Sequence, residues 1–165
     1  MSIRQSLQLL ILAVLVVLNA VAALADTPSV LVPSTPRYAV ILETSGQVEV
    51  KLKDSDWQPG QSGVKLYEED EIRTGKESSA KILLDENGST GRLDLKPESR
   101  MRLGVFEMNE AREKTTVLDL AIGSVLVKVE KLQGNSKFHV RTPNSISGVR
   151  GTEFLVTAKP KESGS

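Results

Sequence analysis

The chain has 165 residues, in which 21 Lys and Arg balance 21 Asp and Glu, with one His and no Cys. This length suits a single domain, and the balanced charge gives no electrostatic footprint for nucleic acid, so no nucleic-acid partner is expected. The missing cysteine excludes disulfides, thiol chemistry and cysteine-ligated metals, so burial of an apolar core must hold the fold together.

Residues 1–25 are typical of a secretory signal peptide. Arg4 supplies an early cation, an apolar run follows at 9–18, and small residues lead to Ala25. That order predicts a signal helix cleaved after Ala25, and a periplasmic or secreted protein without a membrane span after cleavage. The alternative is a retained membrane anchor, because the apolar segment extended toward the cleavage site approaches the ~20 residues that a spanning helix needs.

Residues 26–38 are rich in Pro, Ser and Thr, which is typical of an extended linker. Beyond them, apolar and polar residues alternate in short runs, as in half-buried strands. The runs are "GQVEVKL", "GRLDL", "SRMRLGV", "GSVLVKVE", "KFHV" and "TEFLVTA". We therefore expect residues 39–158 to form an all-β domain of two packed antiparallel sheets, as a β-sandwich, a jelly roll or a solenoid-like roll. A polar tail at 159–165 follows.

Turn residues separate these runs. Asn87-Gly88 predicts a hairpin with a type I′ turn, in which both central residues have positive φ. The alternation in "SRMRLGV" is expected to place Val105 on the buried face. The polar stretch 106–114 that follows is expected to be a loop with at most one helical turn.

The stretch "SGVRGTEF" suggests a binding loop, because two glycines bracket a valine and an arginine. It lacks the Lys-Ser/Thr pair and the helix of a phosphate-binding loop, and no helices flank it as they flank the GXXG loop of KH domains. We therefore expect Gly148 and Gly151 to form a tight bend that leads into the last core strand. For Arg150 we expect an ion pair with Asp70 or Glu71, and an anion or peptide site is the functional alternative.

Other polar and aromatic side chains have simple structural explanations. The acidic run "YEEDE" is expected to be a solvated loop, although paired carboxylates from Glu68, Glu69 and Asp70 could serve an enzyme. His139 is expected at the surface, and one histidine without cysteine provides no catalytic, metal-binding or cofactor-binding residue. Trp57 is expected to cap the core, and stacking on a sugar is its functional alternative.

The motifs "DEIRTG", "NGS", "VRTP" and "VRGTEF" occur in the order found in the FecR domain of bacterial envelope proteins, which the chain resembles over about residues 40–157. The resemblance implies an all-β, non-enzymatic periplasmic domain, which in the best-known members is part of a signalling regulator of iron uptake. It also implies structural signature positions at Thr74, Gly75, Gly88, Pro143, Gly148, Arg150, Gly151 and Thr152.

We therefore expect a non-enzymatic module for protein interaction, signalling or scaffolding in the envelope, without a cofactor. Its partner would be an envelope protein or a cell-wall ligand. The alternative is a carbohydrate- or peptidoglycan-binding β module with Trp57 as the stacking platform. The expected partner contacts are Arg150 and Trp57, because a partner could add a strand or insert a carboxylate at the sheet edges near Arg150.

Overall fold

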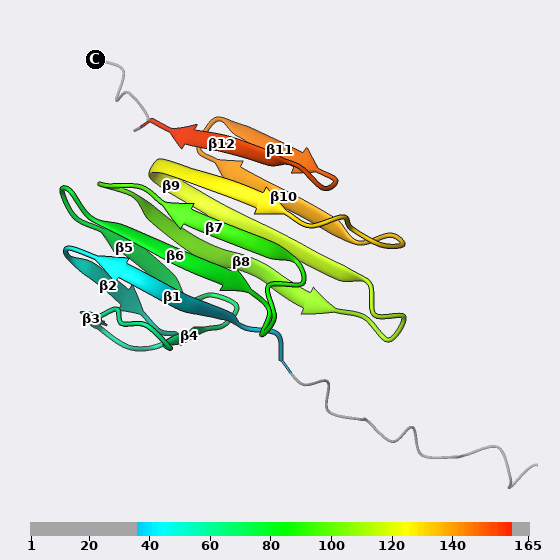
Figure 1. Cartoon of the computed structure of the whole chain (residues 1–165), viewed down its shortest axis with the longest axis horizontal. Helices are drawn as coiled ribbons and strands as arrows, with labels where there is room; N and C mark the ends of the chain where they lie inside the picture. Colours follow the sequence, from blue (N-terminus) through cyan, green and yellow to red (C-terminus); the bar gives the residue numbers. More distant parts are fainter. Residues whose placement is uncertain (1–35, 160–165) are drawn as a thin grey trace, which may run out of the picture. The chain divides into compact units, whose positions relative to one another are not determined.

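The computed structural model describes residues 36–159 (Figure 1). The predicted signal peptide, most of the linker and most of the tail lie outside these residues. The described part consists of strands, turns and loops without a helix, which confirms the all-β prediction. The strands are β1 (Ala39–Ser45), β2 (Val48–Lys51), β3 (Trp57–Pro59), β4 (Lys65–Leu66), β5 (Glu71–Thr74), β6 (Ser79–Leu84), β7 (Gly91–Leu95), β8 (Arg100–Met108), β9 (Lys114–Val129), β10 (Lys137–Thr142), β11 (Ser145–Val149) and β12 (Glu153–Ala158).

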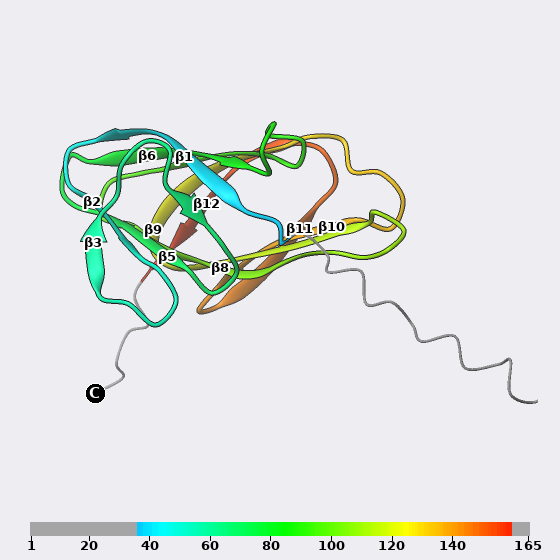
Figure 2. The same ribbon diagram turned by 90° about the horizontal axis from the view of Figure 1, so that it is seen from below.

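The strands form one 12-stranded sheet, whose main order is β3-β2-β5-β8-β9-β7-β6-β1-β4. The 16-residue strand β9 joins its two halves, because its first part pairs with β8 and β10 and its second part with β7 and β12. The expected pair of separate sheets is therefore replaced by a single curled sheet (Figure 2). The pairing of β9 with β10 is parallel, which corrects the expectation of purely antiparallel strands.

The sheet curls because the chain crosses repeatedly from one half to the other, and its corners include those after β1, after β5, after β7 and inside β9. Gly46 and Gly123 occupy two of these corners with φ of +71° and +89°, a conformation that glycine adopts without steric cost. A Cβ on Gly123 would lie 2.5 Å from Cα of Ser99 in the neighbouring corner. The amide of Ser124 donates a hydrogen bond to Oγ of Ser99 at 2.9 Å, so adjacent corners are fastened together.

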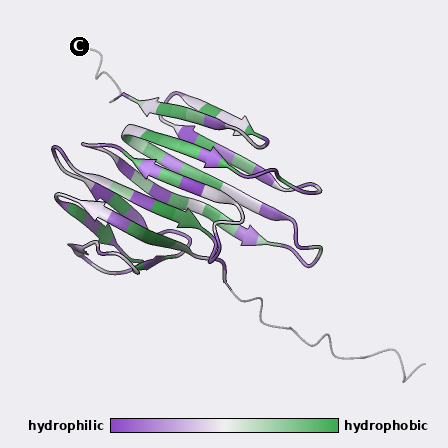
Figure 3. Cartoon of the chain, viewed as in Figure 1, coloured by the Kyte–Doolittle hydropathy of each residue, from purple (hydrophilic) through white to green (hydrophobic). Residues whose placement is uncertain are grey.

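Apolar side chains from both halves meet in one core, as the alternating hydropathy along the strands in Figure 3 indicates. The predicted alternation is correct for most strands, because the inward residues are almost fully buried. The largest of these buried side chains are Phe138, Ile41, Leu66, Ile72, Ile82, Leu84, Leu93, Leu95, Met101, Leu103, Leu118 and Leu120. Their burial supplies the stability of a domain that has no disulfide.

A β-bulge in β8 breaks the predicted alternation between Leu103 and Val105. Beyond the bulge Phe106 faces the core with 3% of its surface exposed, whereas Val105 is only half-buried, so the expected inward position of Val105 is wrong. A bulge inserts one unpaired residue and shifts the side chains that follow. The expected loop is present at 109–113 as a short hairpin turn, whereas residues 106–108 belong to β8 and residue 114 begins β9.

The two ends of the main strand order belong to one segment, residues 57–66, which contains both β3 and β4. Gly63 donates its amide to the carbonyl of Ile41 at 2.7 Å, and Ile41 donates its own to Val64 at 3.0 Å, so the segment is tied to β1. On the opposite side of the sheet, β11 pairs with β10 alone and β12 with β9 alone within residues 36–159. The longer strands with a free edge are therefore β11 and β12 (Figure 1).

Candidate functional site

Two signature positions in the first half of the domain, Thr74 and Gly75, connect neighbouring corners of the sheet through hydrogen bonds. Thr74 is buried, and its hydroxyl donates to the carbonyl of Lys96 at 2.6 Å and accepts from the amide of Ser99 at 3.0 Å. Gly75 donates its amide to the carbonyl of Gln47 at 2.9 Å. These bonds satisfy backbone groups that the corners remove from the sheet ladder, so the two residues have a local role in the fold.

Two other signature positions lie in turns between strands. Gly88 has a φ of +63° and lies in the connection 85–90 between β6 and β7. The predicted hairpin is present, but this connection is longer than a type I′ turn, and Asp85 rather than Asn87 is the second residue with positive φ. Pro143 lies in the turn between β10 and β11.

Arg150 lies in the bend between β11 and β12, where its Nη2 donates a hydrogen bond to the carbonyl oxygen of Gly134 at 2.8 Å. The expected ion pair with Asp70 or Glu71 is wrong. Asp70 is buried and accepts hydrogen bonds from two backbone amides, and Glu71 pairs with Arg100 at 2.7 Å. The guanidinium therefore binds the connection between β9 and β10.

The two glycines of "SGVRGTEF" have different environments. Gly151 has a φ of +73°, and a Cβ there would lie 3.2 Å from Cα of Lys131. The carbonyl of Thr152 accepts the amide of Val129 at 3.0 Å, so the bend 150–152 packs along the start of the β9–β10 connection. Gly148 lies inside β11 instead of in the bend, and a Cβ on it would lie 3.1 Å from the His139 ring.

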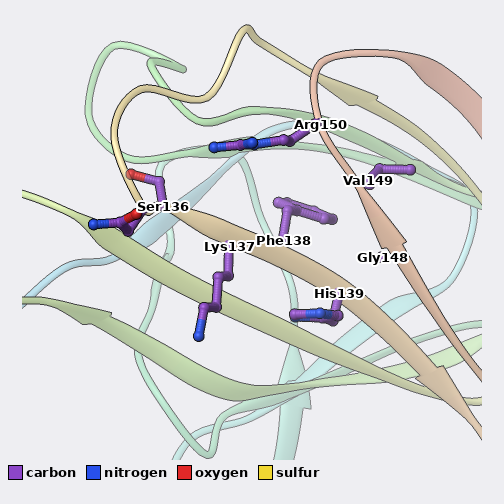
Figure 4. Close-up of a pocket in the computed structure, with 8 residues that line it drawn as sticks. Ser136, Lys137, Phe138, His139, Gly148, Val149 and Arg150 are labelled. Atoms are coloured by element: carbon purple, nitrogen blue, oxygen red, sulfur yellow. The ribbon is translucent and has the colours of Figure 1, made fainter.

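An open pocket of about 390 Å³ lies beside this bend, which we call the β10–β11 pocket (Figure 4). Figure 4 shows Arg150 above Phe138 and the side chains of Lys137 and His139 below it. Phe138 is 1% exposed and packs in the core, whereas the cations Lys137 and Arg150 also line the pocket. The remaining lining residues are Asn135, Ser136, Gly148 and Val149. The pocket can therefore accept an anionic group.

The outer face of β2, β5, β8, β9 and β10 presents a row of paired charges, where opposite charges lie on adjacent strands and stabilise the sheet. The ion pairs are Glu49–Arg73 (2.7 Å), Glu71–Arg100 (2.7 Å), Glu69–Arg102 (2.9 Å), Asp119–Arg102 (2.8 Å) and Asp119–Arg141 (2.6 Å). Most of these side chains are a fifth to a half exposed. The charged side chains of this row therefore pair with one another.

Trp57 lies on this charged outer face, opposite Lys51 in the ladder, and not over the core as expected. The guanidinium of Arg73 lies 4.2 Å from the centroid of its ring and that of Arg100 lies 5.4 Å away. Both distances suit cation–π contacts. These arginines compete with a sugar for the ring.

The carboxylate of Asp119 on β9 pairs with Arg102 on β8 and Arg141 on β10, and it lies over Gly104 of β8. A Cβ on Gly104 would lie 2.5 Å from Oδ2 of Asp119 and 2.8 Å from Nη2 of Arg141, so the glycine makes room for this ion pair. Burial alone would raise the pKa of Asp119, but hydrogen bonds from Arg141 and Arg102 outweigh it and lower the pKa. The glycine and the ion pair belong to the same bulged region of β8.

Sequence reasoning missed a buried ion pair that begins in the predicted linker. Arg37 binds Asp85 through Nε at 2.8 Å and Nη2 at 3.1 Å, with 4% and 14% of the two side chains exposed. Its Nη1 donates to the carbonyl oxygens of Glu107 and Thr115, and the guanidinium lies 4.0 Å from the ring centroid of Phe106. Residue 37 is therefore fixed to the domain.

The carboxylate of Asp85 also binds Lys114 at 2.6 Å and the hydroxyl of Thr90. Burial alone would raise the pKa of Asp85, but hydrogen bonds from Arg37, Lys114 and Thr90 lower it to about 2. We call Arg37, Asp85, Thr90 and Lys114 the Arg37 cluster. No local motif marks it, because Asp85 lies 48 residues from Arg37.

The acids that could have served an enzyme are used by the fold. Glu68 accepts the amide of Phe106 at 2.8 Å, Glu69 pairs with Arg102, and Asp70 accepts the amides of Lys53 and Tyr67. Within residues 36–159, no group of His, Cys, Asp and Glu is arranged to hold a metal ion. The same residues contain no helix that is long and apolar enough to cross a membrane.

A comparison with protein-family models finds one family whose model the chain matches. The family model described as "FecR protein" matches residues 70–164, more than half of the chain. Comparisons with curated proteins and with solved structures found no match. The matched region includes the β10–β11 pocket, the bend 150–152 and the connection 85–90, and begins after Trp57.

Proposed function

Because the chain belongs to the FecR protein family, we propose that it is a non-enzymatic protein-interaction module of the bacterial envelope, acting in signalling or scaffolding. The predicted signal peptide supports export to the periplasm, and the use of its acids within the fold supports a role without catalysis. The partner is an envelope protein.

The observation that supports this function is the free edge of β11 beside the β10–β11 pocket. An unpaired strand edge presents backbone donors and acceptors that an extended segment of another protein can use as a new strand. Ile146 on β11 and Leu155 on the neighbouring edge β12 are 69% and 61% exposed. The cations Lys137, on the adjacent strand β10, and Arg150, in the bend after β11, line the pocket beside this edge and attract an acidic side chain of the bound segment.

Site-specific cross-linking in living cells tests the proposal. A photo-reactive residue at Ile146 should form a cross-link to a discrete envelope protein, whereas one at Leu42, which is 46% exposed on β1, should not. With the photo-reactive residue moved to the exposed Ser145 of β11, Ile146→Ser should reduce the yield by about tenfold, because ~1.4 kcal/mol of apolar burial corresponds to one decade of affinity. Equal yields from the two positions would contradict a partner site at β11.

The second candidate is a carbohydrate- or peptidoglycan-binding module built on Trp57. It is weaker, because Arg73 and Arg100 already occupy the surroundings of the ring. Sedimentation with isolated cell wall separates the two functions: this candidate requires that the protein pellets with cell wall and that Trp57→Ala abolishes pelleting while the circular dichroism spectrum is unchanged. A protein that stays in the supernatant excludes it.

A further inference from the structure

A second cavity adjoins the β9–β10 connection and shares Ser136 with the β10–β11 pocket. It has a volume of about 240 Å³, and we call it the basic cleft. The connection 85–90, the β8–β9 hairpin and residues 131–136 line it, and Ser136 lines both cavities. Its lining residues are Ser89, Thr90, Arg112, Lys114, Lys131, Leu132, Gln133 and Ser136.

The floor of the basic cleft is a fixed positive charge. Lys114 reaches Asp85 at 2.6 Å, Ser89 at 2.8 Å and Thr90 at 3.3 Å, which uses the three hydrogens of its ammonium group. Asp85 binds Arg37 as well, so the two cations exceed the single carboxylate by one charge. An anion that enters the cleft therefore meets a floor with a net positive charge.

Two further cations line the cleft without a partner. Among residues 36–159, no salt bridge or side-chain hydrogen bond involves Arg112 or Lys131. The hydroxyl of Ser136 accepts the amide of Lys114 at 3.1 Å, which leaves its proton free to be donated. The cleft thus offers a guanidinium, an ammonium and a hydroxyl, the donors that bind carboxylates and phosphates.

The acid that follows Arg112 in the sequence, Glu113, already has hydrogen-bond partners. Glu113 accepts hydrogen bonds from Nδ2 of Asn109 at 2.9 Å, and from the amide and Nδ2 of Asn135 at 3.1 and 2.8 Å. The hydrogen bonds from Asn109 and Asn135 hold the pKa of Glu113 below its ordinary value. Its carboxylate therefore holds the hairpin tip to the β9–β10 connection through these three hydrogen bonds, and neither Arg112 nor Lys131 is among its partners.

The lining also contains the apolar side chain of Leu132, which packs against the core. Methylene groups of an acidic side chain can contact it, whereas a free phosphate cannot use it. The connection itself is held by Arg150 on Gly134 and by Gly151 packed on Lys131. The bend of "SGVRGTEF" therefore positions Lys131 without lining the basic cleft.

We propose that the basic cleft binds carboxylate side chains of an acidic segment of the partner protein, with Arg112 and Lys131 as the recognising cations. The segment that pairs with β11 can continue past Ser136 into the cleft, because that residue borders both cavities. The inference rests on the proposed function for the source of the carboxylates. It adds the chemical class of the partner and two residues that recognise it.

Peptide binding to the purified protein at low ionic strength tests the proposal, since attraction between exposed charges is screened by salt. A labelled peptide of alternating Glu and Ser should bind, and the matched Gln and Ser peptide should not. The double variant Arg112→Gln/Lys131→Gln should bind the acidic peptide about tenfold more weakly, from ~0.7 kcal/mol for each charge. The control variant Lys76→Gln/Arg92→Gln removes the same net charge from exposed sites and should bind as the natural chain does.

Three results would overturn the proposal. They are equal binding of the acidic and neutral peptides, equal losses in the two double variants, and complete competition by inorganic phosphate at the concentration of the peptide. The cross-linking at Ile146 does not use Arg112 or Lys131. Failure of the peptide experiment together with a specific cross-link at β11 therefore removes the acidic segment and leaves the proposed function standing.

Discussion

Replacing Arg37 by Met should destabilise the domain, although the sequence places this residue in a linker. The substitution keeps an unbranched side chain that can contact Phe106, and removes the guanidinium from Asp85 and from two carbonyl oxygens. Both members of the ion pair are largely buried, with 4% and 14% of their side chains exposed. The change therefore leaves a buried carboxylate with fewer partners.

The expected loss is ~3 kcal/mol in the free energy of unfolding. Removing one partner of a buried pair costs about 3–5 kcal/mol, and the lower value applies because Lys114 still neutralises Asp85. The pKa of Asp85, lowered from its ordinary value of 3.8 to about 2, gives an independent measure. A pKa that is lower in the folded protein adds stability above the unfolded value, here about 2 kcal/mol, and that stability is lost as the pH falls toward 2.

Urea unfolding at neutral pH and at several acidic pH values measures both quantities. The natural chain should lose about 2 kcal/mol through Asp85 between roughly pH 5 and pH 2, and Arg37→Met should lose less over the same range, because its Asp85 has a higher folded pKa. Arg37→Met/Asp85→Asn should recover about 1 kcal/mol of the loss, which reports the coupling of the pair. Lys81→Met, in the exposed ion pair with Glu43, is the matched control and should have little effect.

A loss below about 1 kcal/mol for Arg37→Met would refute the reasoning, because that value is typical of a solvated ion pair. A double variant that loses the sum of the two single variants would show that Arg37 and Asp85 act independently. Either result would mean that the segment before β1 is only loosely held.

Four further substitutions test other parts of the fold. Gly151→Ala should lower the free energy of unfolding by about 1 kcal/mol because of its positive φ, and Gly148→Ala should lower it less; equal losses in urea would contradict different roles. Gly123→Ala should cost at least ~2 kcal/mol, since its Cβ collides with the backbone of a neighbouring corner, and a stable variant would show that the corner is not tightly packed. Gly104→Ala should displace an arginine and raise the pKa of Asp119, which an NMR titration measures; an unchanged pKa would argue against the glycine's role.

The strands were predictable because burial on one face leaves a period of two in the sequence. This holds for Leu93 and Leu95 and for Phe138 and Val140, which are buried as predicted. The period of two fails at Val105, because the β-bulge in β8 depends on its pairing with β9. Side chains from β9 and β10 occupy the space over Gly104. The sequence of β8 alone does not predict which residues of other strands lie there.

The candidate site was predictable only in part. The glycine and arginine of the bend indicated a fixed backbone near the end of the domain, and Arg150 does lie beside a pocket. Its partner could not be predicted, because a carbonyl oxygen such as that of Gly134 has no sequence signal. The Arg37 cluster and the basic cleft each combine segments that are far apart in the chain, which is why neither produced a recognisable motif.

The placement of the short strands β3 and β4 limits how copies of this domain could assemble. Strands of three and two residues, one of which ends in Pro59, offer little ladder for another chain to extend. An open filament needs two complementary surfaces on opposite sides of each subunit, whereas a closed pair needs only one. Within residues 36–159 the longer free edges are those of β11 and β12, so we expect strand-mediated contacts between copies to form on that side of the domain and not at β3 or β4.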